Sequence, residues 1–102
     1  MNKYHLLMNG RNFLVEMDGK LAKHGFFENF FVEAESPEEA EALAVGKIRG
    51  NEDLKAITQN PEDDPPIIVV EEMSELESFD GVETMESGKA WFLEKRWWEF
   101  WK

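Results

Sequence analysis

Hydrophobic and polar residues alternate between positions 26 and 34, and this period of two predicts a β-strand because side chains alternate sides along a strand. One face is apolar apart from a single acid and consists of Phe26, Glu28, Phe30, Val32 and Ala34. The other face begins aromatic and ends acidic, with Phe27, Asn29, Phe31, Glu33 and Glu35. We predict that the first face is buried in the core. We also expect the aromatic half of the second face to be covered, by the C-terminal aromatic residues.

The period changes to that of a helix over residues 37–49. The apolar stripe of this helix consists of Ala40, Leu43, Ala44 and Ile48. Ser36 is a suitable N-cap and Pro37 fits the first helical position. Glu39 stands three residues after the cap, as in a capping box, and Gly50 follows the last turn. The sequence therefore predicts a strand that leads directly into a capped amphipathic helix.

Two shorter segments precede this strand. Residues 3–8 and residues 12–17 each predict a strand, and the Asn9-Gly10 dipeptide between them is a turn signal. The dipeptide forms either a tight hairpin or a bulge within one long strand, since both use a residue at positive φ. Residues 20–24 are mostly polar and are predicted to be a connection.

The pattern is less regular after the helix. Residues 53–58 predict a short helical turn, and the prolines and acids of residues 60–66 predict a loop. The β-branched run at residues 67–70 predicts a strand that is buried on both faces, in the middle of a sheet. The acidic segment 73–86 is predicted to be mostly irregular.

Aromatic residues dominate the end of the chain. Residues 89–93 predict a last strand, and residues 94–102 predict a short helix, with a longer strand through Trp97 as the alternative. The elements together predict an α+β fold. We expect a two-layer sandwich with a mostly antiparallel sheet of about four to five strands, one main helix at about 37–49 and a short C-terminal aromatic helix. The length predicts a single domain, residues 1–102.

Composition narrows the class of protein. The absence of cysteine excludes a disulfide framework, a thiolate zinc site and a cysteine nucleophile, and it fits a reducing compartment. The first ten residues lack the apolar run of a signal peptide. No segment approaches the ~20 apolar residues of a membrane span. We therefore expect a cytoplasmic protein with no membrane partner.

The net charge of −11 is concentrated in one part of the chain. Residues 52–86 contain twelve acids and one base, Lys55, whereas the rest of the chain balances at ten acids and ten bases. Such a segment repels nucleic acid and attracts basic proteins. It is either a solvated surface that keeps the protein soluble or a binding surface for a basic partner.

Candidate catalytic groups are few. His5 and His24 are isolated in the sequence and are expected to be structural. The Ser87-Gly88-Lys89 segment resembles the end of a phosphate-binding loop, but the preceding glycine is too distant and nearby glutamates would repel phosphate. The adjacent acids lack the alternation of an EF-hand loop. We therefore expect no catalytic residue, no cofactor and no metal site, and a protein that is not an enzyme.

The last twelve residues hold four tryptophans and two phenylalanines. A short helix cannot bury all of them on one face. These rings either cover a small core or form an interface, for which aromatic residues and arginine are the enriched types. The candidate partner-binding residues are Trp91, Arg96, Trp97, Trp98, Phe100 and Trp101.

Three segments also carry a recognisable pattern. They read G-F-F-x-x-F-x-V-E-A at residues 25–34, S-x-E-E-A at 36–40 and P-x-I-x-V-E-E at 66–72. The pattern resembles that of a family of small uncharacterised bacterial proteins, over about residues 3–76. The resemblance implies a bacterial cytosolic origin, and it brings no activity, cofactor or catalytic residue with it.

Three functions are compatible with these features. The first is a non-enzymatic protein-interaction module whose aromatic C-terminal surface binds a protein partner or a second copy of the chain. The second is an acidic inhibitor, of the immunity-protein or DNA-mimic type, that binds a basic partner through residues 52–86. The third is a small enzyme or ligand-binding domain, which requires a pocket with polar groups around His5 or His24.

Overall fold

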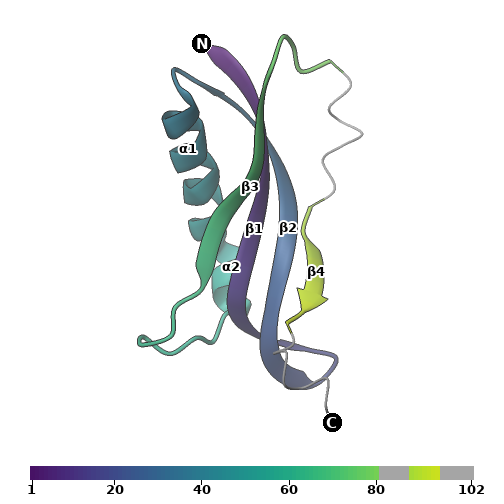
Figure 1. Cartoon of the computed structure of the whole chain (residues 1–102). Coiled ribbons are helices and arrows are strands. Elements are labelled where there is room, and N and C mark those ends of the chain that lie inside the picture. Colours follow the sequence, from purple (N-terminus) through teal and green to yellow (C-terminus); the bar gives the residue numbers. More distant parts are fainter. Residues whose placement is uncertain (81–87, 95–102) are drawn as a thin grey trace.

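The computed structural model describes residues 1–80 and 88–94 of the chain (Figure 1). The elements are, in order, β1 (Asn2–Met17), β2 (Lys20–Ala34), α1 (Pro37–Arg49), α2 (Glu52–Ile57), β3 (Ile67–Leu76) and β4 (Ala90–Leu93). The strands form one sheet in the order β3-β1-β2-β4, and every pairing is antiparallel. This arrangement confirms the predicted α+β class with one main helix. The predicted C-terminal helix falls almost entirely on residues 95–102, outside the described residues.

The two longest strands, β1 and β2, form a hairpin at the centre of the sheet. Asp18 and Gly19 turn the chain with φ angles of 54° and 78°. Positive φ at both positions is what a two-residue hairpin loop needs to match the twist of its strands. The prediction that residues 20–24 are a connection is wrong, because they pair with residues 13–17 of β1 and extend β2. Cross-strand pairing outweighs their polar composition.

The first two predicted strands are one strand with a bulge. The register between β1 and β2 shifts between Gly10 and Phe13, and Asn12 has a φ of 61°. Gly10 is required beside the bulge because a Cβ there would collide with the ring of Phe26 on the paired strand. Of the two alternatives, the bulge is therefore the correct one.

Helix α1 begins as predicted. The backbone N–H of Glu39 donates to Oγ of Ser36 at 3.2 Å. The Glu39 carboxylate accepts from the N–H of Glu35 at 3.4 Å, one residue before the cap, so the capping box is not reciprocal at Ser36 itself. Ala40, Ala44 and Ile48 are buried, but Leu43 is 42% exposed and was wrongly placed on the buried stripe.

Strand β3 differs from its prediction in place and in length. It lies at the edge of the sheet, paired with β1 alone among the described strands, and Ile67 at its start is 52% exposed. A continuous apolar run is thus not enough to make a strand central. Residues 73–76, predicted to be irregular, continue β3 opposite residues 3–6 of β1. Residues 81–86 of that predicted irregular segment lie outside the described part.

Both helices lie on one side of the sheet, and the core is formed between them and the strands (Figure 1). The buried core residues are Tyr4, Leu6, Met8, Phe13, Val15, Phe26, Val32, Ala34, Ala40, Ala44, Ile48 and Leu54. The predicted inner face of β2 is therefore confirmed. Glu28, on the same face, is paired with Nζ of Lys89 at 3.2 Å. None of the helices in the described part of the chain has the length and apolarity needed to cross a membrane.

Candidate functional site

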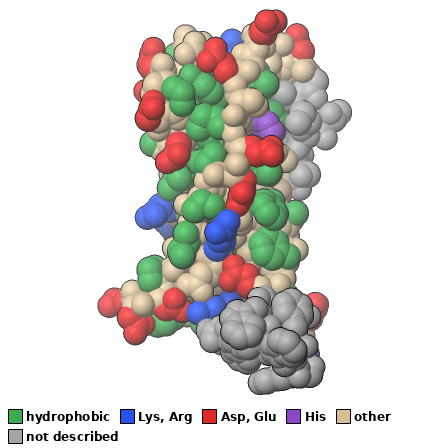
Figure 2. Space-filling model, viewed as in Figure 1, with side chains coloured by type: hydrophobic (Ala, Val, Ile, Leu, Met, Phe, Trp, Pro, Cys, Tyr) green, Lys and Arg blue, Asp and Glu red, His purple; other side chains and the backbone are tan. Residues whose placement is uncertain are grey.

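The face of the sheet that points away from the helices is the candidate functional surface, and we call it the open face (Figure 2). Residues that pair directly across strands share a face, so the register identifies its members. Three rows cross the open face: Ser74–His5–Phe31, Glu72–Leu7–Asn29 and Val69–Asn9–Phe27. Phe27 is 37% exposed, although it neighbours Phe26 in the core. No helix among the described residues covers this face.

Four aromatic side chains on this face form two pairs, and we call the four together the aromatic strip, defined as Phe27, Phe31, Phe79 and Phe92. The rings of Phe27 and Phe92 have centroids 5.5 Å apart, and those of Phe31 and Phe79 are 6.3 Å apart. Phe92 lies directly over Gly25, where a Cβ would collide with its ring. Phe92 remains 38% exposed. The strip therefore presents aromatic surface that the described chain leaves partly uncovered.

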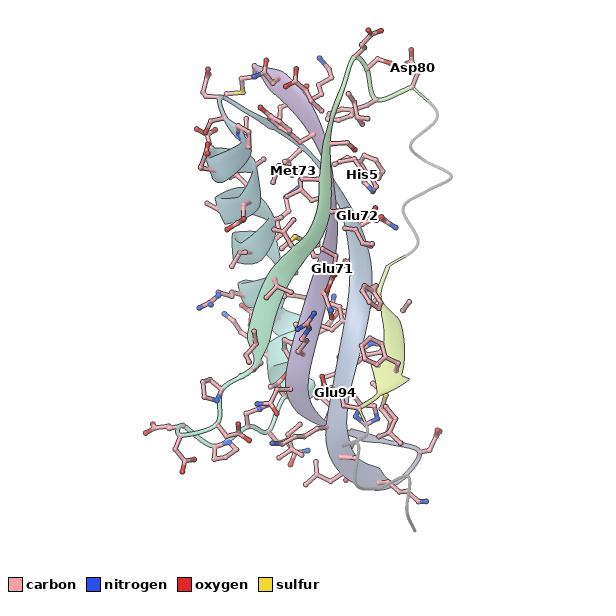
Figure 3. All side chains as sticks on the ribbon, in the orientation of Figure 1. His5, Glu71, Glu72, Met73, Asp80 and Glu94 are labelled. Atoms are coloured by element: carbon pink, nitrogen blue, oxygen red, sulfur yellow. The ribbon has the colours of Figure 1, made fainter. Side chains whose placement is uncertain are left out.

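The histidines make ordinary structural contacts. The ring of His5 stacks on Phe31 at 4.8 Å, and its Nε2 lies 2.7 Å from Oδ1 of Asn29 (Figure 3). Nδ1 of His24 lies 2.8 Å from the carbonyl oxygen of Ala22, and the ring meets Trp91 edge-on. A hollow of about 420 Å³ opens beside His24 and includes Asp18 and Lys20 in its lining. In this arrangement each histidine contacts one aromatic ring and lies within hydrogen-bond distance of one oxygen atom.

A polar cluster crosses the open face between β1 and β3. One oxygen of Glu71, Oε1, accepts from Asn9 at 2.7 Å and from Arg11 at 2.8 Å (Figure 3). The hydrogen bond from Asn9 and then that from Arg11 favour the carboxylate and lower the pKa of Glu71 below its ordinary value of 4.5. Glu71 also sits where β3 shifts register against β1. The cluster therefore holds the irregular part of this pairing.

Glu71→Gln is expected to remove a pH-dependent part of the stability. Because the folded-state pKa is lowered, the carboxylate contributes stability above pH 4.5 and loses it as the pH falls through the folded-state pKa. The difference in thermal midpoint between the native chain and Glu71→Gln should shrink as the pH is lowered from about 6 to about 3. The control is Glu72→Gln, which removes the neighbouring exposed acid of β3. An equal pH-dependent change in both variants would contradict the assignment.

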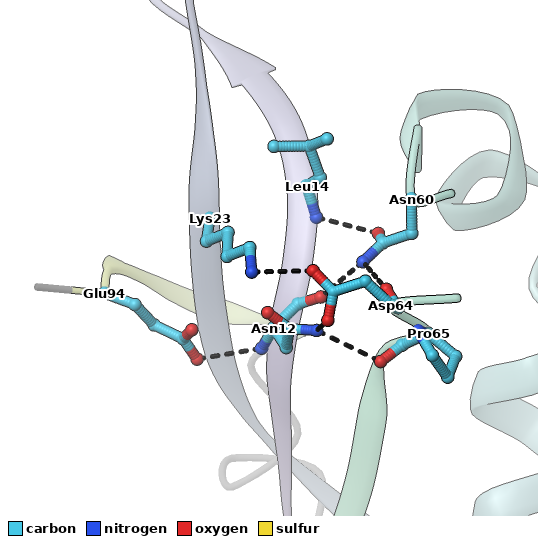
Figure 4. A network of polar contacts seen from close by, with 7 residues as sticks. All are labelled: Asn12, Leu14, Lys23, Asn60, Asp64, Pro65 and Glu94. Carbon is cyan, nitrogen blue, oxygen red and sulfur yellow. Dashed lines mark hydrogen bonds and ion pairs between the residues drawn. The ribbon is translucent and has the colours of Figure 1, made fainter. Parts of the chain in front are cut away.

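A second polar network fastens the β1 bulge to the loop before β3 (Figure 4). Nδ2 of Asn12 donates to Oδ1 of Asp64 at 2.9 Å, and its backbone N–H donates to Oε2 of Glu94 at 2.9 Å. Asn60 accepts from the N–H of Leu14 at 2.8 Å and donates to the carbonyl oxygens of Asn12 and Asp64. Asp64 also pairs with Lys23 at 2.7 Å. The side chains of the network satisfy the hydrogen-bonding groups of one another and of the backbone. Such a network stabilises the contact between the bulge and the loop.

Metal and cofactor chemistry has little support in this arrangement. The described residues contain no group of three or more histidine, aspartate or glutamate side chains placed to hold a metal ion. Asp64 and Glu94, which both accept hydrogen bonds from Asn12, are engaged by amide and lysine donors.

The structure places one of the predicted partner-binding residues. Trp91 points to the helix side of the sheet, where it packs against Phe26 at 5.0 Å and Phe13 at 6.4 Å, and it is half-buried. Arg96, Trp97, Trp98, Phe100 and Trp101 lie outside the described residues. Phe92 was counted among the C-terminal aromatic residues but not among the partner-binding candidates, and Phe79 was predicted to lie in an irregular segment. The alternation of Trp91 and Phe92 along a predicted strand was the signal that would have placed Phe92 opposite Trp91.

Comparison with known proteins gives no match: no protein-family model fits this chain, and neither a curated protein nor a solved structure is similar to it. The resemblance drawn from the three sequence motifs stays a prediction.

Proposed function

We propose that this protein is a non-enzymatic protein-interaction module, and that the partner it binds is a second copy of the same chain. The interface would consist of the aromatic strip together with the aromatic residues that follow β4. The observation that carries the proposal is the strip itself, because aromatic side chains on a sheet face without a helical cover favour burial against another surface.

The charge of the open face supports self-association. Its two closest ion pairs, Arg11–Glu71 at 2.8 Å and Lys23–Asp64 at 2.7 Å, neutralise acids on or beside this face. These pairs reduce the repulsion between two copies of a chain that carries −11, although Glu72 adds negative charge to the same face. A two-fold interface uses the same patch on both copies, so a self-complementary aromatic strip suits it.

The area of the open face is close to that of a standard protein interface. The long strands β1 and β2 contain 16 and 15 residues. With three to four strands spaced about 4.8 Å apart, the face covers on the order of 500–700 Å². A standard protein interface buries about 800 Å² on each partner. The open face, extended by a few further aromatic side chains, reaches that area.

The test is the solution mass by light scattering after size exclusion, at low and high salt. We expect a dimer at both salt concentrations, because burial of aromatic surface depends little on screening. Phe27→Ala/Phe92→Ala is expected to raise the dissociation constant by about 100-fold or more, since central aromatic residues dominate interface energies. The matched control is Leu43→Ala/Ile57→Ala, which removes two apolar side chains of similar exposure, 42% and 43%, from the helices.

Two results would overturn self-association. One is a folded monomer at both salt concentrations, and the other is an equal loss of dimer in the control variant. The dissociation constants of the Trp97→Ala and Trp98→Ala variants, measured in the same way, show how much the C-terminal residues contribute to dimer formation. A chain that ends after Leu93 shows whether the aromatic strip is enough for dimer formation without the residues that follow it.

The acidic surface supports a second candidate, an inhibitor that binds a basic partner. The acids of β3, Glu71, Glu72 and Glu75, and Glu77 after it are exposed along one edge of the sheet. The same charges also discourage the edge of β3 from pairing with other strands. Binding to a basic protein through these acids should weaken steeply with salt, whereas binding through the aromatic strip should not.

A further inference from the structure

A cavity on the helix side of the sheet lies away from the aromatic strip. It has a volume of about 420 Å³ and opens between α1, α2, the loop after α2 and β3. Pockets that bind small molecules have volumes of about 300–1,000 Å³. The apolar part of its lining consists of Phe13, Ile48, Leu54, Pro65, Pro66 and Ile68.

The floor of the cavity belongs to the core. Phe13, Ile48 and Leu54 are buried core residues with hydrocarbon side chains, so the small surface that they present to the cavity is apolar. The lining also contains the hydroxyl of Thr58, which donates to the carbonyl oxygen of Leu54 at 2.6 Å. The floor therefore favours an apolar group over water or a polar group.

The charges of the lining are opposite to those of the chain. The lining contains two cations, Arg49 and Lys55, and no acid, in a sequence that has 22 acids and 11 bases. Arg49 makes no ion pair with any residue that the structure describes. Lys55 pairs with Glu52 at 3.9 Å, and because both side chains are more than half exposed this pair is weak.

The end of helix α1 explains part of this charge. Arg49 lies in the last turn, where a cation interacts favourably with the helix dipole. Lys47 in the same turn satisfies that dipole without lining the cavity. The helix dipole does not explain why Arg49 and Lys55 line the same apolar cavity.

We propose that this cavity binds a small amphipathic carboxylate, with its hydrocarbon chain on the floor and its head group at Arg49 and Lys55. A guanidinium presents a planar pair of donors that matches a carboxylate, and an ammonium adds a second positive charge. The apolar floor supplies affinity and the two cations select the anion. This site is separate from the open face and does not depend on the proposed self-association.

The test compares decanoate with decanol, which has the same chain length and no charge. Titrations by calorimetry are made below the concentration at which decanoate aggregates. We expect the native chain to bind decanoate at least about tenfold more tightly than decanol, because only the carboxylate meets the two cations. Arg49→Gln/Lys55→Gln should weaken decanoate binding by about tenfold and leave decanol binding unchanged.

The matched control is Lys20→Gln/Lys47→Gln, which lowers the net charge by the same two units at positions that do not line the cavity. Decanoate binding should then change by less than about twofold, because neither lysine lines the cavity and both are exposed, so their charges are screened by solvent and salt. Circular dichroism of each variant confirms that it is folded.

Three results would overturn the proposal: no binding of decanoate, equal binding of decanol, or an equal loss in the control variant. The Phe27→Ala/Phe92→Ala variant separates the two proposals, because it should bind decanoate as the native chain does even where self-association is lost. Amide shifts on decanoate addition that centre on β2 and β4, with none near Leu54 and Ile68, would also contradict the site.

Discussion

Phe26→Ala is expected to lower the free energy of unfolding by about 3–5 kcal/mol, the range for removing a buried phenylalanine. Phe26 is fully buried, and its ring contacts Phe13 at 5.2 Å and Trp91 at 5.0 Å. It also fills the space over Gly10, where no side chain is present to replace it. Alanine would leave a cavity where the bulge of β1, the centre of β2 and β4 meet. Chemical denaturation measures the loss as a lower midpoint with an unchanged slope.

Phe27→Ala is the matched control, because it makes the same change one residue along the strand. Phe27 points to the open face and retains 37% of its accessible surface, so its replacement should cost about 1 kcal/mol or less in the monomer. The measurement is made at a protein concentration low enough to exclude association. If Phe27→Ala were as destabilising as Phe26→Ala, the assignment of the two faces of β2 would be wrong, since a shift of one residue exchanges them.

Asn60→Ala is expected to lower the free energy of unfolding by about 2–4 kcal/mol. The side chain makes three hydrogen bonds, with the N–H of Leu14 at 2.8 Å and with the carbonyl oxygens of Asn12 and Asp64 at 2.7 and 2.9 Å (Figure 4). Each such bond contributes about 0.5–1.5 kcal/mol, and a partly buried group left without a partner costs more. Hydrogen exchange of the Leu14 amide should become faster, because that amide loses its acceptor.

The control for Asn60 is Gln59→Ala, which removes a neighbouring amide side chain. Gln59 is exposed, and its contact with β1 is made by its backbone N–H, which donates to the carbonyl oxygen of Leu14 at 2.8 Å and is kept by alanine. The unfolding free energy of the Gln59→Ala variant should differ from that of the native chain by less than about 0.5 kcal/mol. Equal losses in the two variants would mean that the loop itself, and not the Asn60 side chain, fastens the bulge.

Errors in the sequence prediction occur where a segment depends on distant parts of the chain. Residues 67–70 have the composition of a central strand, yet β3 pairs with β1 alone among the described strands because strand order is decided by the whole sheet. Residues 20–24 look like a polar connection, yet they pair with β1 because the turn at Asp18 sets the register. In both cases the local composition was read correctly and the pairing partner was unknown.

The candidate surfaces also combine local features that the sequence predicts with distant contacts that it does not predict. Alternation in β2 predicted that Phe27 and Phe31 lie on the face opposite Phe26, and that aromatic residues from later in the chain cover them. The partners at these rings are Phe92, one of the C-terminal aromatic residues expected there, and Phe79, which was not expected there. The cavity with Arg49 and Lys55 has no signal in the sequence, because its lining comes from five separate segments.

The sequence by itself determined the features that near neighbours control: the cap and length of α1, the loop at residues 60–66, the inner face of β2 and the location of the negative charge. Hydrogen bonds within one turn, proline geometry and side-chain alternation all act over a few residues, so a local pattern is enough. Only the tertiary structure decided which strand is at the edge, which aromatic rings meet on the open face and which cations border the apolar cavity. These depend on contacts between segments far apart in the chain, and such contacts are set by the packing of the whole sheet.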